Sequence, residues 1–135
     1  SGPPYPESRA RHRIAKAIQD AHYSLYGLGW LEKAALRDDH FLFLRHTYEL
    51  LERLLTALFA LNHTWFCEEK RLTRRVASFP YAPAQVESRL RSIIMHQGED
   101  SDLPHCLRSI KELCADTVRC AHRRYPDLVL PADWR

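Results

Sequence analysis

The sequence lacks the features that would place it in several large classes of protein. Its apolar runs fall well short of the roughly 20 residues that cross a bilayer. It contains no Cys-x-x-Cys pair, no Gly-rich phosphate loop, no His-Glu-x-x-His motif and no nucleophile elbow. No run alternates apolar and polar residues with a period of two, and no turn signal suggests a hairpin. These absences argue against a membrane-spanning protein, a P-loop enzyme and a sheet protein.

The 135 residues are enough for one domain with a single core, and the net charge of +3 is mild. Such a charge permits contact with phosphates or acidic partners without requiring nucleic acid. The sequence starts without Met and has no signal-peptide pattern, which indicates either an excised fragment or a chain from which a tag was cleaved, and we expect it to be cytoplasmic. We expect its four cysteines, at positions 67, 106, 114 and 120, to be reduced and mostly buried.

Residues 41–75 carry the clearest pattern, and most of this stretch is predicted to form one long helix. Apolar residues recur there at alternating steps of four and three, which places them on one stripe. Between positions 57 and 61 the helix is apolar on every side, so other elements should enclose it. Asp38 or Asp39 is expected to cap its start. The stripe consists of Leu44, Tyr48, Leu51, Leu55, Leu58, Asn62 and Trp65, widened by Leu50, Leu54 and Leu61.

Further helices are predicted around this central one. The first begins near Glu7 and buries Leu28 on its stripe; at Gly27 and Gly29 we expect either a kink or close packing of a neighbouring helix. Others are expected over residues 68–79, over 84–96 with Ile94 buried, and from a cap at Asp102 to about 124. We therefore predict an all-α antiparallel bundle of about five helices over residues 7–125. A flexible lead-in, residues 1–6, precedes it, and an irregular tail, residues 126–135, is expected to pack back on it.

The end of the central helix is the one place where the sequence indicates a site. Asn62 needs partners for its amide inside the fold, Trp65 offers an aromatic face, and Lys70 is a compact cation beside acidic residues. Such a set can hold a small polar or phosphorylated ligand in a groove. Alternatively, Asn62 ends the helix by bonding nearby backbone and Trp65 belongs to the core. The candidate substrate-binding residues are Asn62, Trp65, Glu69, Lys70 and Arg74.

Residues 58–72, LFALNHTWFCEEKRL, resemble a motif of an uncharacterised helical family. Its members have a stretch of the LFALN kind, then an aromatic residue, then a Lys that opens the next helix. They usually lie C-terminal to a nucleotidyltransferase-like domain, with a layout similar to the helical half of kanamycin nucleotidyltransferase. The resemblance covers roughly residues 14–125 and implies roles for Asn62 and Lys70. Cys67 and Glu68 stand where the family usually has a proline.

The resemblance implies a non-catalytic accessory domain that packs against a nucleotidyltransferase-like domain, in cis or in trans, and helps to shape its acceptor pocket. Nucleotidyl transfer on that fold needs a Gly-Ser turn followed by paired aspartates on a strand that hold magnesium. The sequence has no such turn, and Asp100 and Asp102 are expected to lie at the cap of a helix. We therefore expect magnesium and nucleotide only with a separate catalytic domain, and no cofactor bound by this chain alone.

Three alternatives stay open. Arg91 and His96 have the spacing of the active motif of HEPN domains, helical bundles that include dimeric metal-independent ribonucleases or bind nucleic acid; His96 would act in acid–base chemistry and Arg91 would stabilise the phosphate. The second is a protein-interaction module, or a homodimer, in which apolar faces and Trp134 meet a partner helix. The third is a zinc site drawn from His63, Cys67, His105, Cys106, Cys120 and His122.

Overall fold

The computed structural model describes residues 4–66 and 71–135. All regular elements in these ranges are helices, so the all-α prediction is confirmed. No helix among them combines the length and the apolarity needed to span a membrane. The elements are α1 (Glu7–His22), the π-helix η1 (Tyr23–Leu28), α2 (Trp30–Leu36), α3 (His40–Leu61), α4 (Leu72–Val76), α5 (Val86–Met95) and α6 (Leu103–Arg124).

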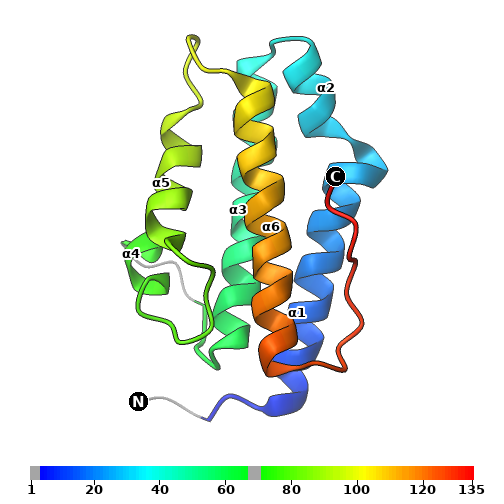
Figure 1. Cartoon of the computed structure of the whole chain (residues 1–135), viewed down its shortest axis with the longest axis vertical. Helices are drawn as coiled ribbons and strands as arrows, with labels where there is room; N and C mark the ends of the chain where they lie inside the picture. Colours follow the sequence, from blue (N-terminus) through cyan, green and yellow to red (C-terminus); the bar gives the residue numbers. More distant parts are fainter. Residues whose placement is uncertain (1–3, 67–70) are drawn as a thin grey trace.

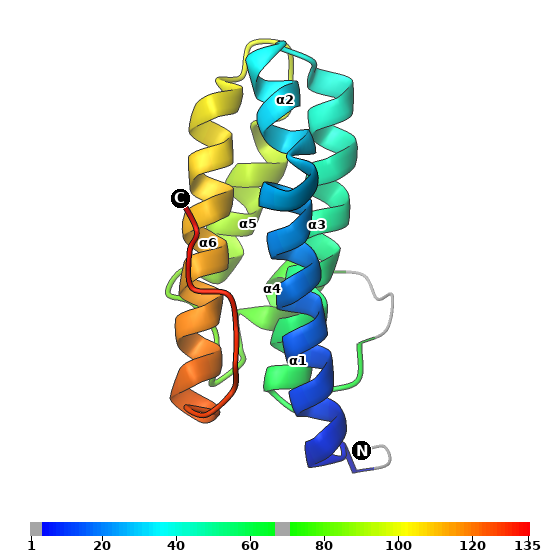
Figure 2. The same cartoon turned by 90° about the vertical axis from the view of Figure 1, so that its right-hand side faces the viewer.

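Successive helical segments alternate in direction and form an antiparallel bundle (Figure 1). α1, η1 and α2 together rise along the bundle, α3 descends, α5 rises and α6 descends. α4 and α5 lie on one side of the α3–α6 pair, and α1 with α2 lies on the other. Figure 2 shows α1 between α3 and α6 on that second side. α3 packs against α1, α2, α4 and α6, so the long helix predicted from the sequence is the central support.

Aspartates begin the two longest helices, as predicted. The Oδ1 atom of Asp39 accepts a hydrogen bond from the amide of Leu42 at 3.1 Å, and Asp102 Oδ1 accepts one from His105, also at 3.1 Å. Each bond satisfies an amide of the first turn that has no partner within its helix. Of the two candidates before α3, Asp39 is therefore the cap.

The core consists of two adjoining clusters, and it confirms the predicted enclosure of residues 57–61, which are all buried. The larger cluster joins α3, through side chains such as Phe43 and Leu54, to residues of α2, α4, α5 and α6. The smaller one joins the start of α1 to the end of α6, with Ile14 and Ala121 among its members. One stripe of α6 is buried throughout: Leu103, Leu107, Ile110, Cys114, Thr117 and Ala121.

The buried face of α3 differs from the predicted stripe in its first half. Leu44 and Tyr48 are 48% and 66% exposed, whereas the neighbouring positions Phe43 and Thr47 are buried. Phe43 belongs to a core cluster that contains residues of η1, α2 and α6, and α3 packs on α2 and α6. Leu44 and Tyr48 lie on the predicted stripe but are exposed, because an apolar side chain is buried only where another element covers it.

The two glycines near the end of the first helix mark a helix interruption rather than close packing of a neighbouring helix. Residues 23–28 form a π-helix, and Gly29 then adopts a left-handed conformation with φ of 68° that separates η1 from α2. A Cβ added at Gly27 would lie 2.4 Å from the Tyr23 ring of its own segment. The wider π-turn also shifts the phase of the stripe. Leu28, predicted to be buried, is consequently exposed.

The predicted helices over residues 68–79 and 84–96 are both shorter than expected. α4 begins at Leu72, after Arg71 with φ of 67°, and α5 begins at Val86, after Gln85 with φ of 57°. A left-handed residue cannot continue an α-helix, so each one sets the start of the element that follows. Ile94, predicted to be buried on α5, is exposed. The positions before Arg71 that were included in the first of these helices, residues 68–70, lie outside the described residues.

The C-terminal tail returns along the bundle, as predicted, and ends beside η1 (Figures 1 and 2). The imidazole Nε2 of His22 bonds the Asp133 carbonyl at 2.8 Å, and the Tyr26 hydroxyl donates to the Arg135 carbonyl at 3.0 Å. Trp134 meets the His22 ring edge-on at 4.9 Å between ring centroids. The tail thus covers apolar and aromatic surface of α1 and η1, and Trp134 packs within its own chain.

Candidate functional site

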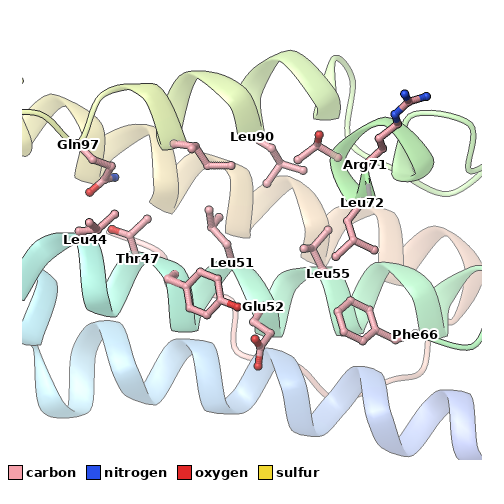
Figure 3. A pocket seen from close by; sticks show the side chains of 13 residues that line it. Leu44, Thr47, Leu51, Glu52, Leu55, Phe66, Arg71, Leu72, Leu90 and Gln97 are labelled. Carbon is pink, nitrogen blue, oxygen red and sulfur yellow. The ribbon is translucent and has the colours of Figure 1, made fainter. Parts of the chain in front are cut away.

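A groove lies between α3 and α5 and reaches the start of α4 (Figure 3). Its volume is about 600 Å³, within the range of small-molecule sites. Leu44, Thr47 and Gln97 lie at one end, and Phe66, Leu72 and Arg71 lie at the other. The complete lining is Leu44, Thr47, Tyr48, Leu51, Glu52, Leu55, Phe66, Arg71, Leu72, Thr73, Leu90, Ile94 and Gln97.

The groove exists because, among residues 4–66 and 71–135, α5 faces an apolar side of α3 without packing closely on it. Leu44, Tyr48, Leu51 and Leu55 repeat along that side at steps of four and three, so they form one wall. The opposite wall belongs to α5, which packs mainly on α4 and α6. Leu44 and Tyr48, the exposed members of the predicted stripe, therefore form part of the rim of this groove.

An ion-pair network fixes the wall that α5 supplies. Arg89 of α5 lies 2.8 Å from the Asp116 carboxylate of α6, which also bonds Arg119 one turn further on. Partial burial alone would raise the pKa of Asp116, but hydrogen bonds from Arg119 and Arg89 outweigh it and hold that pKa below its ordinary value. The carboxylate therefore stays ionised and keeps α5 attached to α6, which leaves the groove side of α5 open.

Two residues that line the groove each carry a buried polar atom with no hydrogen-bond partner in the described part of the chain. One is the hydroxyl oxygen of Thr47, a residue that is only 2% exposed. The other is the side-chain oxygen of Gln97, whose Nε2 donates to the Ile93 carbonyl at 2.9 Å. Buried polar atoms are normally paired, so two unpaired ones at one end of a pocket mark that end as polar within an apolar surface.

The predicted site segment borders the other end of the groove. Phe66 and Arg71, which flank residues 67–70 in the sequence, both line it. Phe66 is held edge-on against Phe59 at 5.1 Å between ring centroids. The Arg71 side chain points away from the groove (Figure 3). Glu69 and Lys70, two of the predicted binding residues, lie outside the described residues.

Asn62 ends α3 by bonding nearby backbone, which is the alternative interpretation given from the sequence. Its Nδ2 donates to the carbonyls of Leu58 and Tyr81, both at 2.8 Å, and its Oδ1 accepts from the Tyr81 amide at 2.9 Å. These bonds close the end of α3 and attach the loop before α5 to it. The amide is thus engaged by the backbone, while its role in binding substrate stays a prediction.

Trp65 and Arg74 do not line the groove. Trp65 stacks at a tilt on Tyr5, with 4.5 Å between ring centroids, and the guanidinium groups of Arg9 and Arg13 lie over its ring at 5.4 and 5.3 Å. These contacts tie the start of the chain to the end of α3. Arg74 is exposed on α4. The structure therefore does not bring Asn62, Trp65 and Arg74 together around one described pocket, and their binding roles stay predictions.

Arg91 and His96 lie on the exposed side of α5 and at its end. The Arg91 guanidinium lies 3.4 Å from Glu87 of the same helix. His96 is the C-cap of α5, and its Nδ1 bonds the Ser92 carbonyl at 2.6 Å. The crevice that His96 lines measures only about 20 Å³. Both side chains therefore have partners typical of a helix surface, and the ribonuclease hypothesis stays a prediction.

The described cysteines are free and buried, in agreement with the expectation of reduced thiols. Burial raises the pKa of Cys106 to about 11 and that of Cys114 further still, so these thiols stay protonated and unreactive. Within residues 4–66 and 71–135, no three His, Cys, Asp or Glu side chains are grouped to hold a metal ion. The zinc hypothesis therefore finds no support among its described members, and Cys67 lies outside them.

A polar cluster closes the lower end of the bundle. His63 Nε2 lies 2.7 Å from the Tyr125 hydroxyl and 3.2 Å from the Glu7 carboxylate, and Arg124 donates to its Nδ1 at 3.3 Å. Burial, with a contribution from Arg124, lowers the pKa of His63, although Glu7 opposes that shift. Arg124 also donates to the carbonyl of Leu61 at 2.7 Å, one of the last carbonyls of α3. The cluster thus joins α1, α3 and α6.

Sequence reasoning missed Thr47 and Gln97. Thr47 carried a usable signal, because a threonine that follows Phe43 by one helical turn lies on a face that proves to be buried. Gln97 carried none, since it follows α5 in a loop.

Comparison of the chain with protein-family models, with curated proteins and with solved structures found no match in any of the three. The groove is therefore interpreted from its own geometry.

Proposed function

We propose that this chain is a non-catalytic helical accessory domain of a nucleotidyltransferase-like protein, and that the α3–α5 groove contributes to substrate binding. One observation carries the binding role: a groove of about 600 Å³ whose walls are mainly apolar and whose rim includes Leu44, Tyr48 and Ile94, all exposed. Apolar surface of this extent, enclosed on two sides, is typical of a site that is covered when a ligand binds.

The position of the groove supports a connection with the predicted site. One end is lined by Phe66, Arg71, Leu72 and Thr73, which precede and follow Lys70 of the family-like motif in the sequence. A ligand that filled the groove would therefore end beside that motif. The partner class follows only from the resemblance, as does the expectation of magnesium and nucleotide on the partner.

The proposed role is non-catalytic because the chemistry of nucleotidyl transfer has no counterpart in this sequence. That chemistry needs paired carboxylates on a strand to hold magnesium. The described elements are helices, and Asp102 bonds the amide of His105 as a helix cap. The domain would accordingly position a substrate for a reaction carried out by its partner.

Thermal unfolding of the purified chain tests the binding role. Nucleotides, aminoglycosides and other small polar metabolites are screened, together with mainly apolar compounds. A ligand at 100 times its Kd stabilises the folded state by about 2.7 kcal/mol, which raises Tm by several degrees. Tyr48→Ala, at the rim of the groove, should reduce the shift for any compound that binds there.

Phe41→Ala is the matched control, because Phe41 is 78% exposed on the same helix but does not line the groove. A shift that Phe41→Ala abolishes and Tyr48→Ala preserves would contradict the assignment of the groove. The partner class has its own test, the coding sequence that precedes residue 1 in the gene. A Gly-Ser turn followed by paired aspartates there would support it, and an upstream region without them, with no such protein co-purifying, would refute it.

A further inference from the structure

We propose that the groove accepts a mainly apolar molecule that carries a neutral hydroxyl, and that this hydroxyl binds between Thr47 Oγ1 and Gln97 Oε1. The inference rests on the proposed binding role of the groove and adds the chemical class of the ligand. Figure 3 shows both side chains at the same end of the groove, one on α3 and the other just beyond α5.

Thr47 is the first part of the argument, because its hydroxyl departs from the behaviour of comparable threonines in this molecule. A threonine inside a helix usually donates to the carbonyl four residues earlier. Thr56 donates to Glu52 at 2.9 Å and Thr117 donates to Leu113 at 2.8 Å in this way. The hydroxyl of Thr47 makes no such bond although the residue is almost fully buried. Thr47, a residue of the groove lining, therefore has a hydroxyl whose hydrogen-bonding capacity no described group uses.

Gln97 supplies the second part. Its Nε2 donates to the Ile93 carbonyl at 2.9 Å and contacts the Cys106 sulfur at 3.7 Å. These contacts fix the orientation of the amide, because Nε2 faces acceptors and Oε1 is left on the other side. Oε1 is buried and has no partner among the described residues. Gln97, a residue of the groove lining, thus carries an unpaired acceptor, Oε1, and the contacts of Nε2 with Ile93 and Cys106 fix its orientation.

The two atoms together define the ligand group. Gln97 Oε1 only accepts a hydrogen bond, whereas a threonine hydroxyl both donates and accepts. A hydroxyl on the ligand satisfies both, because it donates to Gln97 and accepts from Thr47. A carboxylate has no proton to donate to Gln97, and a charged group buried beside two neutral side chains would lack a counter-ion.

The remainder of the groove specifies the body of the ligand. Beyond Thr47 the walls are formed by Leu51, Leu55, Leu72, Leu90 and Ile94. The charged lining residues are Glu52 and Arg71, and the latter points away from the cavity. An alkyl or aryl body therefore matches the walls, and burial of its apolar surface supplies most of the affinity.

Calorimetric titration with two isomers tests the proposal. 1-Octanol and methyl heptyl ether have the same atoms, but only the alcohol can donate a hydrogen bond. We expect the alcohol to bind the unmodified protein about 5- to 10-fold more tightly than the ether, as the one additional hydrogen bond, to Gln97 Oε1, allows. Octanoate, with a charged end, should bind more weakly than either.

Gln97→Met removes the acceptor Oε1 and keeps a side chain of similar length, so it should bring the affinities for the alcohol and the ether within about twofold of each other. Thr47→Val removes a donor from which the oxygen of either molecule can accept, so it should weaken the binding of both by a similar factor. Thr117→Val is the matched control, because it removes a hydroxyl that is already bonded outside the groove, and the preference for the alcohol should persist. Retained helical circular dichroism shows that each variant folds.

The outcomes separate this proposal from the proposed function. Equal binding of alcohol and ether by the unmodified protein, or tighter binding of octanoate, would overturn the hydroxyl assignment and leave the groove as a binding site. A preference for the alcohol that Gln97→Met leaves intact would also overturn it. If none of the three probes and no compound of the wider screen binds, the proposed function itself is refuted. A groove that is filled only by a partner protein would give this result.

Discussion

At the scale of single residues, the same side chain has different consequences according to whether its polar atom is bonded. Thr47 and Thr117 are both buried in long helices, but only the hydroxyl of Thr117 has a partner in the described chain. Burial of an unpaired hydroxyl is costly, whereas a paired one contributes a modest net stabilisation. The two positions therefore form a natural comparison.

We expect Thr47→Val to raise the free energy of unfolding by about 1 kcal/mol, because a methyl group replaces an unpaired buried hydroxyl. Thr117→Val should leave it unchanged or lower it by up to about 1 kcal/mol, because a bond to Leu113 is lost. Urea unfolding of the unliganded variants measures both. A larger loss of stability for Thr47→Val than for Thr117→Val would show that the Thr47 hydroxyl is well solvated or bonded.

Asn62 is expected to be important for stability, whatever its role in binding. Asn62→Ala removes three hydrogen bonds and leaves the carbonyl and amide of Tyr81 without their partner. We expect the free energy of unfolding to fall by about 2 kcal/mol. Gln19→Ala, which removes an exposed amide from α1, is the control and should change it little. An Asn62→Ala protein as stable as the control would contradict this structural role.

At the scale of elements, η1 and Gly29 determine how the first helical segment turns into α2. Gly29 has φ of 68°, a conformation in which other residues are strained, although a Cβ there would meet no atom within 4 Å. We expect Gly29→Ala to lower the free energy of unfolding by about 1 kcal/mol through backbone strain alone. Chemical denaturation of the variant measures the effect.

Gly98→Ala is the control for that experiment, because a Cβ at Gly98 also meets no atom within 4 Å and its φ is not positive. It should leave stability unchanged or raise it slightly, since alanine restricts the unfolded chain. Gly27→Ala should cost little, because the exposed Tyr23 ring can rotate away from the new Cβ. A similar loss at positions 29 and 98 would show that strain at Gly29 is not the cause.

The elements also show what sequence reasoning achieves and where it stops. The existence of the helices and both aspartate caps followed from periodicity and local hydrogen bonding. Their ends did not, because several are set by left-handed residues other than glycine: among the described residues, Asp38, His63, Arg71 and Gln85. His63 completes a Schellman-type end of α3, where the Thr64 amide donates to Phe59 at 2.9 Å. Sequence gives no strong signal for a histidine in that position.

The candidate site shows the same division. The motif around Asn62 was visible because a polar residue interrupts an apolar stripe, and its amide does bond inside the fold. The groove could not be predicted from the sequence, because it depends on the distance between α5 and α3. Periodicity makes Leu44 and Leu51 equivalent, and only the packing of separate elements leaves the first exposed and the second buried.

At the scale of the whole molecule, the cluster around His63 makes stability depend on pH. The pKa of folded His63 is lowered by burial and by Arg124, so the unfolded chain, with a histidine pKa of about 6.5, binds a proton more readily. Above about pH 6.5 neither state is protonated at this position. As the pH falls below that value, protonation favours the unfolded state, and stability falls until folded His63 is protonated too.

Urea unfolding at pH 7.5 and at pH 5.5 measures this dependence. We expect the unmodified protein to lose more stability across this interval than His63→Gln, which has no proton to bind. His12→Gln, which removes an exposed histidine from α1, is the comparison variant. An equal loss in the unmodified protein and in His63→Gln would show that other groups cause the pH dependence.

The packing of α1 along α3 has a kinetic consequence. This is the most extensive contact between helices, and both partners lie within the first 61 residues (Figure 2). Contacts that are close in sequence form rapidly, so we expect this hairpin in the folding transition state and α6 to dock later. Ile18→Val should slow refolding, whereas Ile110→Val should mainly accelerate unfolding, and stopped-flow kinetics distinguish the two. During synthesis, the same order leaves the α6-facing side of α3 uncovered until the last helix emerges from the ribosome.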